Sequence, residues 1–315
     1  MMSQIVLKKS TAELQQMKTH YQALLSPKQP PGSIFTAKTN NCTITAYKSG
    51  KVLFQGAGCQ SEADKWGGSS SAVAPKKKAS APKGSKLPDR FASLSVVGSD
   101  EVGTGDYFGP MTVVAAYVSA TNIPLLKELG VQDSKNLNDQ RIIHIAKQIK
   151  EVIPFSLLTL HNEKYNNMQQ KGMSQGKLKA LLHNQAINSV LGKMSPEKPD
   201  AVLIDQFAQE GVYYNYLKSQ ANIQRENVYF STKGESVHLA VAAASILARY
   251  AFLLRFEELS KKAGFPLTKG AGPKVDECGA KLIHIHGEDS LKYFVKLHFA
   301  NTEKAKALYR KKYKA

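Results

Sequence analysis

Residues 98–110 of this 315-residue chain read Gly-Ser-Asp-Glu-Val-Gly-Thr-Gly-Asp-Tyr-Phe-Gly-Pro. The runs on either side, residues 94–98 and 111–118, are apolar and rich in β-branched side chains, which predicts two strands. Glycines between the strands let the backbone come close to a ligand, and consecutive amides in such a turn can hold phosphate or hydroxyl oxygens. A dinucleotide-binding fingerprint is excluded, because its glycines must open a helix.

Outward from this stretch, the chain alternates between strand and helix patterns. Apolar residues recur at helical spacing in three segments: residues 137–149, 174–194 and 237–259. Residues 201–204 form a short continuous apolar run, as expected of a strand that is covered on both faces. We therefore expect an α/β domain over residues 91–315, with a mixed sheet flanked by helices.

Four acidic residues stand next to these predicted elements. Asp100 and Glu101 follow the first strand, Asp205 follows the run 201–204, and Glu235 precedes the last helix. Carboxylates at the ends of neighbouring buried strands converge at one edge of a sheet. They repel one another unless a cation lies among them, and oxygen ligands suit Mg²⁺ or Mn²⁺. Two such ions would activate a water and stabilise the leaving oxygen in phosphodiester hydrolysis.

Simpler interpretations of these residues stay open. Each acid could be a helix cap or a surface residue, and this reading is strongest for Glu235, beside a helix N-terminus. Glu210 lies about one helical turn beyond Asp205 and competes with Glu235 for the fourth position, although we prefer Glu235. We expect His238 near the site. The pair His284 and His286 lacks a third ligand, so we expect surface residues there.

The chain is strongly basic. It has 43 Lys and Arg against 25 Asp and Glu, a net charge of +18. Residues 1–90 alone carry 14 basic and four acidic side chains. Such a surplus indicates a polyanionic partner, either nucleic acid or an anionic membrane, although a single lysine run can also be a plain solvated surface.

No membrane or secreted location is expected. The apolar run 239–254 is interrupted by Arg249 and falls short of a membrane span, and the N-terminal residues lack the apolar stretch of a signal peptide. The cysteines are three in number and have no metal-ligand spacing, which suits a reducing cytosol. We therefore expect a soluble cytoplasmic protein that binds nucleic acid.

Residues 1–66 predict a small α+β domain. Ser10 and Glu13 form a capping box that opens a helix. The predicted buried stripe of that helix comprises Leu14, Met17, Tyr21 and Leu24. Three strand patterns follow, at residues 34–38, 42–48 and 52–55, and in the second of them apolar residues alternate with Thr and Tyr. One face of this sheet should pack on the helix while the other is exposed.

The exposed face would carry basic and aromatic side chains, namely Lys38, Tyr47, Lys48 and Lys51. Such a face is a plausible nucleic-acid platform, and it is equally typical of many small α+β domains. Between the two predicted domains, residues 67–90 consist mainly of Gly, Ser, Ala, Pro and Lys, which predicts a flexible linker.

The stretch 98–110 resembles the signature of the type 2 ribonucleases H, and ribonuclease HIII in particular. Three further segments agree with that family: residues 133–135 (Asp-Ser-Lys), the strand end 204–205 (Ile-Asp), and residues 234–236 (Gly-Glu-Ser) with 242–249. The related ribonuclease HII lacks the N-terminal domain, usually has Gly-Arg-Gly at residues 103–105, and has Asp in place of Glu235. These differences favour ribonuclease HIII.

The resemblance implies a ribonuclease H-like fold and an N-terminal domain that is similar to half of the TATA-binding protein and grips the RNA/DNA hybrid. It implies endonucleolytic cleavage of the RNA strand, with 5′-phosphate and 3′-hydroxyl products. It also implies that the catalytic ligands of two Mg²⁺ or Mn²⁺ ions are Asp100, Glu101, Asp205 and Glu235. No obligate protein partner is expected, so we expect a monomer.

The resemblance assigns a second group of residues to the substrate. The backbone of Gly103, Thr104 and Gly105 would contact ribose 2′-hydroxyls, the group by which a protein distinguishes RNA from DNA. Matching family positions near the substrate are Ser134, Lys135, Ser245 and Arg249. A lysine at position 135 suits a phosphate contact. Ser245 and Arg249 lie four residues apart on one helix, and either could instead brace that helix.

Two other functions are weighed against hybrid cleavage. A binding protein that lost its activity is disfavoured by the intact acidic set, since buried carboxylates without a cation are costly. A phosphoryl transferase acting on DNA is disfavoured by the Gly-Thr-Gly turn at residues 103–105, which suits ribose recognition.

Overall fold

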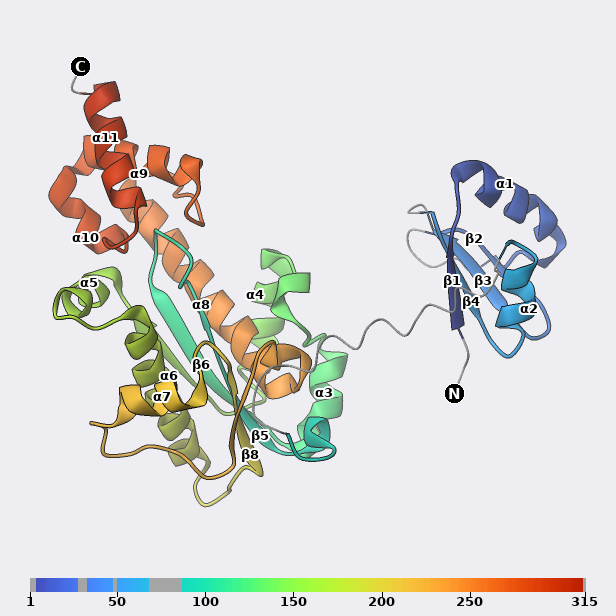
Figure 1. Ribbon diagram of the computed structural model, residues 1–315, viewed down its shortest axis with the longest axis horizontal. Coiled ribbons are helices and arrows are strands. Elements are labelled where there is room, and N and C mark those ends of the chain that lie inside the picture. Colours follow the sequence, from blue (N-terminus) through green and yellow to red (C-terminus); the bar gives the residue numbers. More distant parts are fainter. Residues whose placement is uncertain (1–3, 28–32, 48–49, 68–86, 314–315) are drawn as a thin grey trace. The chain divides into compact units, whose positions relative to one another are not determined.

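The computed structural model describes residues 4–27, 33–47, 50–67 and 87–313, and the chain divides into two compact units, Met1–Ala81 and Pro82–Ala315 (Figure 1). Most of the predicted linker, residues 67–90, lies outside the described residues, so its flexibility stays a prediction. Lys48, predicted to face nucleic acid, also lies outside them.

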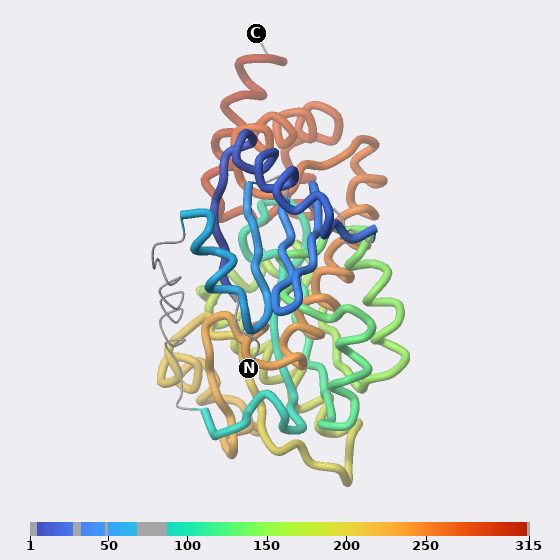
Figure 2. The backbone as a smooth tube through the Cα atoms, turned by 90° about the vertical axis from the view of Figure 1, so that its right-hand side faces the viewer, coloured from blue at the N-terminus to red at the C-terminus, as the bar shows by residue number. Residues whose placement is uncertain are grey.

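The N-terminal unit is a four-stranded antiparallel sheet of order β1-β4-β3-β2. Its elements are β1 (Gln4–Lys8), α1 (Thr11–His20), β2 (Ser33–Lys38), β3 (Thr43–Tyr47), β4 (Lys51–Gln55) and α2 (Cys59–Asp64). Figure 2 follows this part of the chain, in blue, through the strands and α1. The predicted capping box at Ser10 and Glu13 is confirmed. The burial of Leu24 was predicted wrongly: α1 ends earlier, at His20, and the Leu24 side chain is 45% exposed.

One face of this sheet packs and the other is open. The packed face joins α1 and α2 in a core that includes Met17, Phe35, Ile44 and Phe54. By strand alternation and register, the opposite face carries Lys38, Tyr47, Lys51 and Gln55. The expectation that this face is exposed throughout is wrong at Thr45, because its short side chain lies between Thr36 and Leu53 in the register and is buried.

The larger unit contains a five-stranded mixed sheet of order β7-β6-β5-β8-β9. Its strands are β5 (Val96–Val102), β6 (Met111–Val118), β7 (Phe155–Leu160), β8 (Ala201–Asp205) and β9 (Val228–Ser231). Strands β5, β6 and β7 are antiparallel neighbours, whereas β8 and β9 run parallel to β5. The predicted α/β class with a mixed sheet is therefore confirmed.

Helices cover both faces of this sheet, and others pack beyond one end of it. The helices of this unit are α3 (Ile123–Glu128), α4 (Asp139–Ile149), α5 (Asn162–Gln170), α6 (Gln175–Met194), α7 (Glu210–Leu217), α8 (Leu239–Ala263), α9 (Pro273–His286), α10 (Leu291–Phe294) and α11 (Asn301–Tyr313). Figure 1 shows α8 running along β5 and β6 on one side, with α6 on the other. Consecutive residues of β6 point to opposite faces of the sheet: Val114 packs in the core with α4 and α8, whereas Val113 packs in the core with α6.

The backbone of β5 lies directly against α8. A side chain on Gly98 would come within 2.2 Å of the Ala240 carbonyl carbon, so only glycine fits there. The prediction that this strand ends at Gly98 was wrong, because β5 continues to Val102. Asp100 and Glu101 are therefore strand residues, held in register by β6 on one side.

Helix α8 explains one further difference from the sequence analysis. By length and composition it could cross a membrane, despite Arg249, contrary to our expectation. However, 67% of its most apolar stretch is buried inside the protein. Its apolar residues, such as Val241 and Ile246, belong to the core beneath the sheet. Core packing thus accounts for the composition of α8.

Candidate active site

Asp100 and Asp205 lie on neighbouring parallel strands: Asp205 is the last residue of β8, and Asp100 is in β5 just past its pairing with β8. Ser99 of β5 pairs with Ile204 of β8, which puts the two aspartates at the next position along the register. Burial raises the pKa of Asp100 well above its ordinary value, and the nearby charges of Asp205 and Glu101 raise it further. Burial also raises the pKa of Asp205, although its Oδ1 atom accepts a 2.8 Å hydrogen bond from the Gly234 N–H.

Glu101 leaves β5 on the face opposite to Asp100, as consecutive strand residues do. Its carboxylate is bound from α6: Lys179 Nζ lies 2.9 Å from Oε1, and His183 Nε2 lies 3.0 Å from Oε2. Burial acts to raise the pKa of Glu101, but these two partners outweigh it and bring the pKa down to about 2. Glu101 is therefore held as a carboxylate.

Glu235 lies in the short turn Gly234–Ser236, just before α8, and is 7% exposed. Burial raises its pKa, and the hydrogen bond from the Lys135 ammonium group partly offsets that effect. The competing residue, Glu210, is exposed at the start of α7. Its charge contributes to raising the pKa of Tyr214 and is not among the causes that shift the pKa of Asp100 or Asp205. The geometry thus favours Glu235 over Glu210 as the fourth carboxylate near the aspartates.

The chemistry of these four carboxylates fits a hard divalent cation, because two of them are buried beside like charges that a cation would neutralise. Within the described ranges, however, no three His, Cys, Asp or Glu side chains are placed to hold one ion together. Glu101 is bound to α6 residues and Glu235 to Lys135. Shared ligation of an ion by all four carboxylates therefore stays a prediction.

The predicted substrate residues Ser134, Ser245 and Arg249 lie close to Asp100. The Oγ atoms of Ser134 and Ser245 are 2.8 Å apart, and a hydrogen bond from Ser245 favours the ionised form of Asp100. Arg249 donates to the Ser134 carbonyl at 2.6 Å and pairs with Asp139 at 2.7 Å. Arg249 thus braces the segment before α4 against α8, the bracing role that the sequence left open.

The glycine-rich turn between β5 and β6 is shaped by two different glycines. Gly103 has a φ angle of +94°, and a side chain there would approach the Pro110 carbonyl oxygen to 2.2 Å, so the turn requires glycine. Gly105 is exposed, and a side chain there would meet no atom within 4 Å. Thr104 accepts a 3.1 Å hydrogen bond on its carbonyl oxygen from Gln175. The turn is therefore fixed on one side and open on the other.

The sequence reasoning missed the α6 residues that bind Glu101. His183 is fully buried, and its Nδ1 atom lies 2.6 Å from the Ser99 hydroxyl. The Phe207 ring stacks on His183 at 5.0 Å and also lies 4.4 Å from the Lys179 ammonium. A lysine and a histidine four residues apart on an otherwise apolar helix face were the available signal. Their partner, Glu101, is 82 residues from His183 in the sequence.

The other histidines that the sequence analysis considered make contacts elsewhere. His238 caps α8: its Nδ1 atom accepts from the Ala240 N–H at 3.0 Å, and its Nε2 atom lies 3.1 Å from the Leu94 carbonyl oxygen. Burial lowers the pKa of His238 to about 4. His284 and His286 are exposed, as expected, and the His284 ring stacks on Tyr313 at 4.2 Å.

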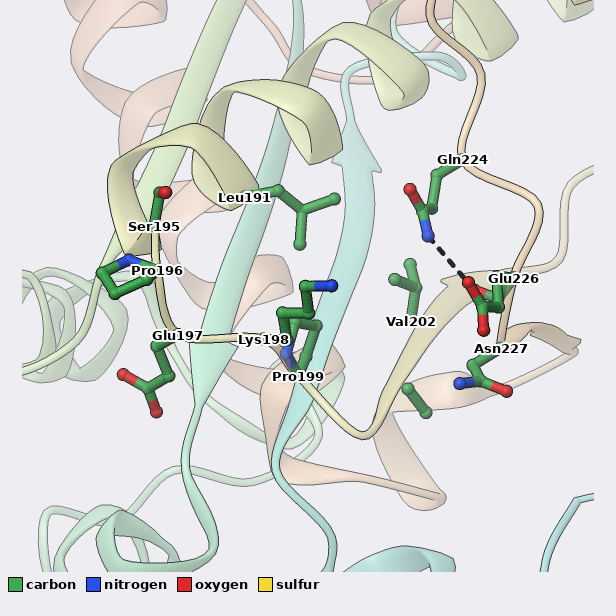
Figure 3. A pocket seen from close by; sticks show the side chains of 11 residues that line it. Leu191, Ser195, Pro196, Glu197, Lys198, Pro199, Val202, Gln224, Glu226 and Asn227 are labelled. Carbon is green, nitrogen blue, oxygen red and sulfur yellow. Dashed lines mark hydrogen bonds between the residues drawn. The ribbon is translucent and has the colours of Figure 1, made fainter.

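A cavity of about 420 Å³ lies at the other end of the sheet (Figure 3). It is lined by Leu191, residues 195–199, Ala201, Val202, Gln224, Glu226 and Asn227. Ala201 pairs with Val96 at the start of β5, whereas the aspartates stand at the far ends of these strands. The cavity is therefore separate from the acidic site.

Comparison with known proteins agrees with this geometry. A family model described as Ribonuclease HII matches residues 97–302, and a model described only as a domain of unknown function matches residues 4–80. The ribonuclease HIII of one Bacillus cereus strain is 60% identical over 306 residues, which cover 97% of this chain and 98% of that protein. The ribonuclease HIII of Bacillus anthracis is 60% identical over 311 residues, with coverages of 97% and 98%.

Solved structures give the same result. The crystal structure of Bst-RNase HIII in complex with Mn²⁺ matches with a TM-score of 0.72 and 44% identity, over 98% of this chain and all of that one. The Aquifex aeolicus RNase H3 structure has a TM-score of 0.54 and 23% identity, over 94% of this chain and 100% of that chain, and supports the fold alone. With its mixed sheet, its paired strand-end aspartates and this level of identity, the chain belongs to the ribonuclease HIII family of hydrolases.

Proposed function

We propose that this chain cleaves the RNA strand of RNA/DNA hybrids internally, by a two-ion mechanism that leaves 5′-phosphate and 3′-hydroxyl ends. The observation that carries the proposal is the position of Asp100 and Asp205, side by side on parallel strands where the pairing of β5 with β8 ends, and with pKa values raised by burial. The Mn²⁺ bound by the related Bst-RNase HIII supports a divalent cofactor, Mg²⁺ or Mn²⁺.

At the acidic site, the carboxylates would bind the ions and Lys135 would contact the substrate. Bound ions would supply positive charge for activating a water and stabilising the leaving oxygen. Asp100 is the most buried of the strand-end acids, and we assign it the central position, with Glu101, Asp205 and Glu235 around it. The Lys135 side chain is 74% exposed although it contacts Glu235, so it is available to a backbone phosphate.

Selection of RNA would come from the turn at residues 103–105. The turn is open at Gly105, so an RNA strand can reach the protein backbone there. Backbone amides there would donate to ribose 2′-hydroxyl groups, which DNA lacks.

Affinity for the hybrid would come from the N-terminal unit. Lys38, Tyr47 and Lys51 share the open face of its sheet, and no Asp or Glu occurs in its four strands. A face of this kind would bind the phosphate backbone largely by charge.

Cleavage of matched duplexes tests the proposal. RNA/DNA, RNA/RNA and DNA/DNA duplexes of one sequence are incubated with the full chain in Mg²⁺, in Mn²⁺ and in chelator, and the product ends are identified. We expect cleavage of the hybrid only, and only with a divalent ion. Cleavage of DNA/DNA would contradict ribose selection, and activity in chelator would contradict the ion requirement. Binding of the hybrid without any product would favour a non-catalytic binding protein.

A further inference from the structure

A lysine is buried next to the glycine-rich turn. Lys296, between α10 and α11, is 0% exposed and forms no ion pair within the described part of the chain. Its ammonium group donates to two backbone carbonyl oxygens of the turn, those of Asp106 at 2.8 Å and Gly109 at 2.6 Å. An ammonium group without an ion-pair partner is costly to bury: burial lowers the pKa of Lys296 to about 7, and the nearby Asp106 charge offsets this effect only in part. Such a group is better explained by a role at the turn than by stability alone.

The backbone around Lys296 binds the same turn. Its N–H donates to the Tyr107 carbonyl oxygen at 2.9 Å, and the Gly109 N–H donates to the carbonyl oxygen of Phe294 at 3.0 Å. Between the two carbonyls that accept from the ammonium group, Tyr107 and Phe108 are fully buried. The second half of the turn is thereby fixed to the C-terminal segment, which packs at this end of the unit (Figure 1).

The first half of the turn is held by a second donor. Gln175, the first residue of α6, donates to the Thr104 carbonyl oxygen at 3.1 Å, and its amide also donates to the Tyr165 hydroxyl at 3.1 Å. Because a trans peptide is planar, the Gly105 N–H must point opposite to that carbonyl. None of these bonds uses the N–H groups of residues 103–105. Holding the Thr104 carbonyl from inside therefore directs the Gly105 N–H toward the open side of the turn.

We propose that Lys296 is a positioning residue for ribose recognition: with Gln175, it holds the carbonyl groups of the turn inward so that the Gly105 amide faces the RNA strand. This inference rests on the proposed hybrid cleavage and deepens it. Lys296 is fully buried and its ammonium group binds carbonyl groups of the turn rather than any of the four carboxylates, so it acts through the turn.

The test combines protein variants with substrate variants. RNA/DNA hybrids are prepared in which the RNA strand has a single 2′-deoxy residue, moved one position at a time across a mapped cleavage site. For the full chain, kcat/KM at that site should fall when the recognised hydroxyl is removed. Lys296→Met keeps the length of the side chain but removes its donors. We expect it to lower kcat/KM on the unmodified hybrid by roughly tenfold, the scale of a lost charged hydrogen bond.

The informative quantity is the penalty for removing the 2′-hydroxyl. We define this penalty as kcat/KM on the unmodified hybrid divided by kcat/KM on the 2′-deoxy hybrid. In Lys296→Met the ratio should fall toward one, because the turn no longer presents its amide. A merely structural defect would instead lower kcat/KM on both hybrids by the same factor and leave the ratio unchanged. The concentration of Mg²⁺ needed for half-maximal rate should stay unchanged. Lys292→Met is the matched control, since Lys292 is exposed in the same segment and lies against the Tyr293 ring, and its penalty should equal that of the parent chain.

Gln175→Met gives an independent answer if Lys296→Met does not fold, and it should reduce the same penalty by a smaller factor. An undiminished penalty in folded Lys296→Met, or in Gln175→Met, would overturn the inference while leaving hybrid cleavage intact. Failure of the parent chain to cut hybrids at all would instead overturn the proposed function.

Discussion

The two units of this protein cover their sheets in different ways. Among the described residues, helices pack on one face of the N-terminal sheet and leave the other open, whereas the larger unit has α6 on one face of its sheet and α8 on the other. An open face is a broad surface whose basic side chains remain solvated and can bind a polyanion. A sheet covered on both faces leaves only the strand ends free, and carboxylates there are partly withdrawn from water.

The difference between the covered and the open sheet is also seen in the burial of their charged side chains. At the covered sheet, burial raises the pKa values of Asp100, Asp205 and Glu235. The open face carries lysines that are exposed, such as Lys38 and Lys51. We infer that one unit is built for affinity and the other for chemistry, and four experiments can separate these roles.

The largest effect is expected from Asp205→Asn. Removing this charge should reduce cleavage by roughly a thousandfold or more, the scale of losing one charged group from a catalytic set. Hybrid affinity should barely change, because the open sheet face is untouched. Single-turnover cleavage and equilibrium binding measure the two quantities, with Glu210→Gln as the control at an exposed acid. If Asp205→Asn kept most of the activity, Asp205 would not belong to the ion-binding set.

Acid should destabilise the covered unit selectively, through His238. Its pKa is about 4 in the folded chain and near 6.5 when unfolded, so between these values only the unfolded chain binds the proton. Stability is therefore lost as the pH falls from about 6.5 to about 4, by about 3 kcal/mol in total. His238→Asn, which can still accept from the Ala240 N–H, should show much less of this loss.

Urea unfolding followed by two signals measures this effect. The single tryptophan, Trp66, lies in the N-terminal unit, so its fluorescence reports that unit, whereas circular dichroism is dominated by the helices of the larger one. As the pH falls from about 6.5 to about 4, the urea concentration at the unfolding midpoint should decrease when it is measured by circular dichroism and stay unchanged when it is measured by fluorescence. Equal acid sensitivity of the parent chain and His238→Asn would contradict this assignment.

Deletion of residues 1–66 tests the affinity role directly. Linking two binding surfaces raises affinity without new contacts, so the deletion should weaken hybrid binding by about a hundredfold at physiological salt. Cleavage at saturating enzyme should persist, because the carboxylates all belong to the other unit. Equally tight binding by the truncated chain would show that the catalytic unit alone supplies the affinity.

The smallest effect is expected from Lys38→Gln combined with Lys51→Gln. Each lost phosphate contact should reduce the slope of log affinity against log salt by about 0.9, so the pair should change it by nearly 2. The rate at saturation should not change. Lys65→Gln is the control, because Lys65 lies at the end of α2 and pairs with Glu62. An unchanged slope would remove the open face from the binding surface.

Much of the fold could be predicted from the sequence, because buried strands and amphipathic helices have periodic apolar patterns. The start and end of α6, from its cap at Ser174 to Met194, follow directly from such a pattern. The end of β5 could not be found this way, since residues 99–101 are polar and are kept in the strand by the β6 ladder. Strand β9 was missed for a similar reason: it is a four-residue edge strand, only half of it buried.

The candidate site was less predictable than the fold. The placement of Asp205 beside Asp100 followed from two strand patterns, but the opposite orientations of Asp100 and Glu101 depend on the strand continuing past Gly98. The roles of His183 and Lys296 needed the tertiary structure, because their partners are distant in the sequence; the spacing of Lys179 and His183 on α6 marks the pair but not its partner Glu101.

The order of the elements also governs when activity can arise during synthesis. The open sheet is complete before the ribosome has made β5, whereas β5 must wait for β8, and then for α8, before its aspartate gains neighbours. Long-range parallel pairing of this kind forms late. A nascent chain would therefore complete its open sheet face well before its acidic site could assemble.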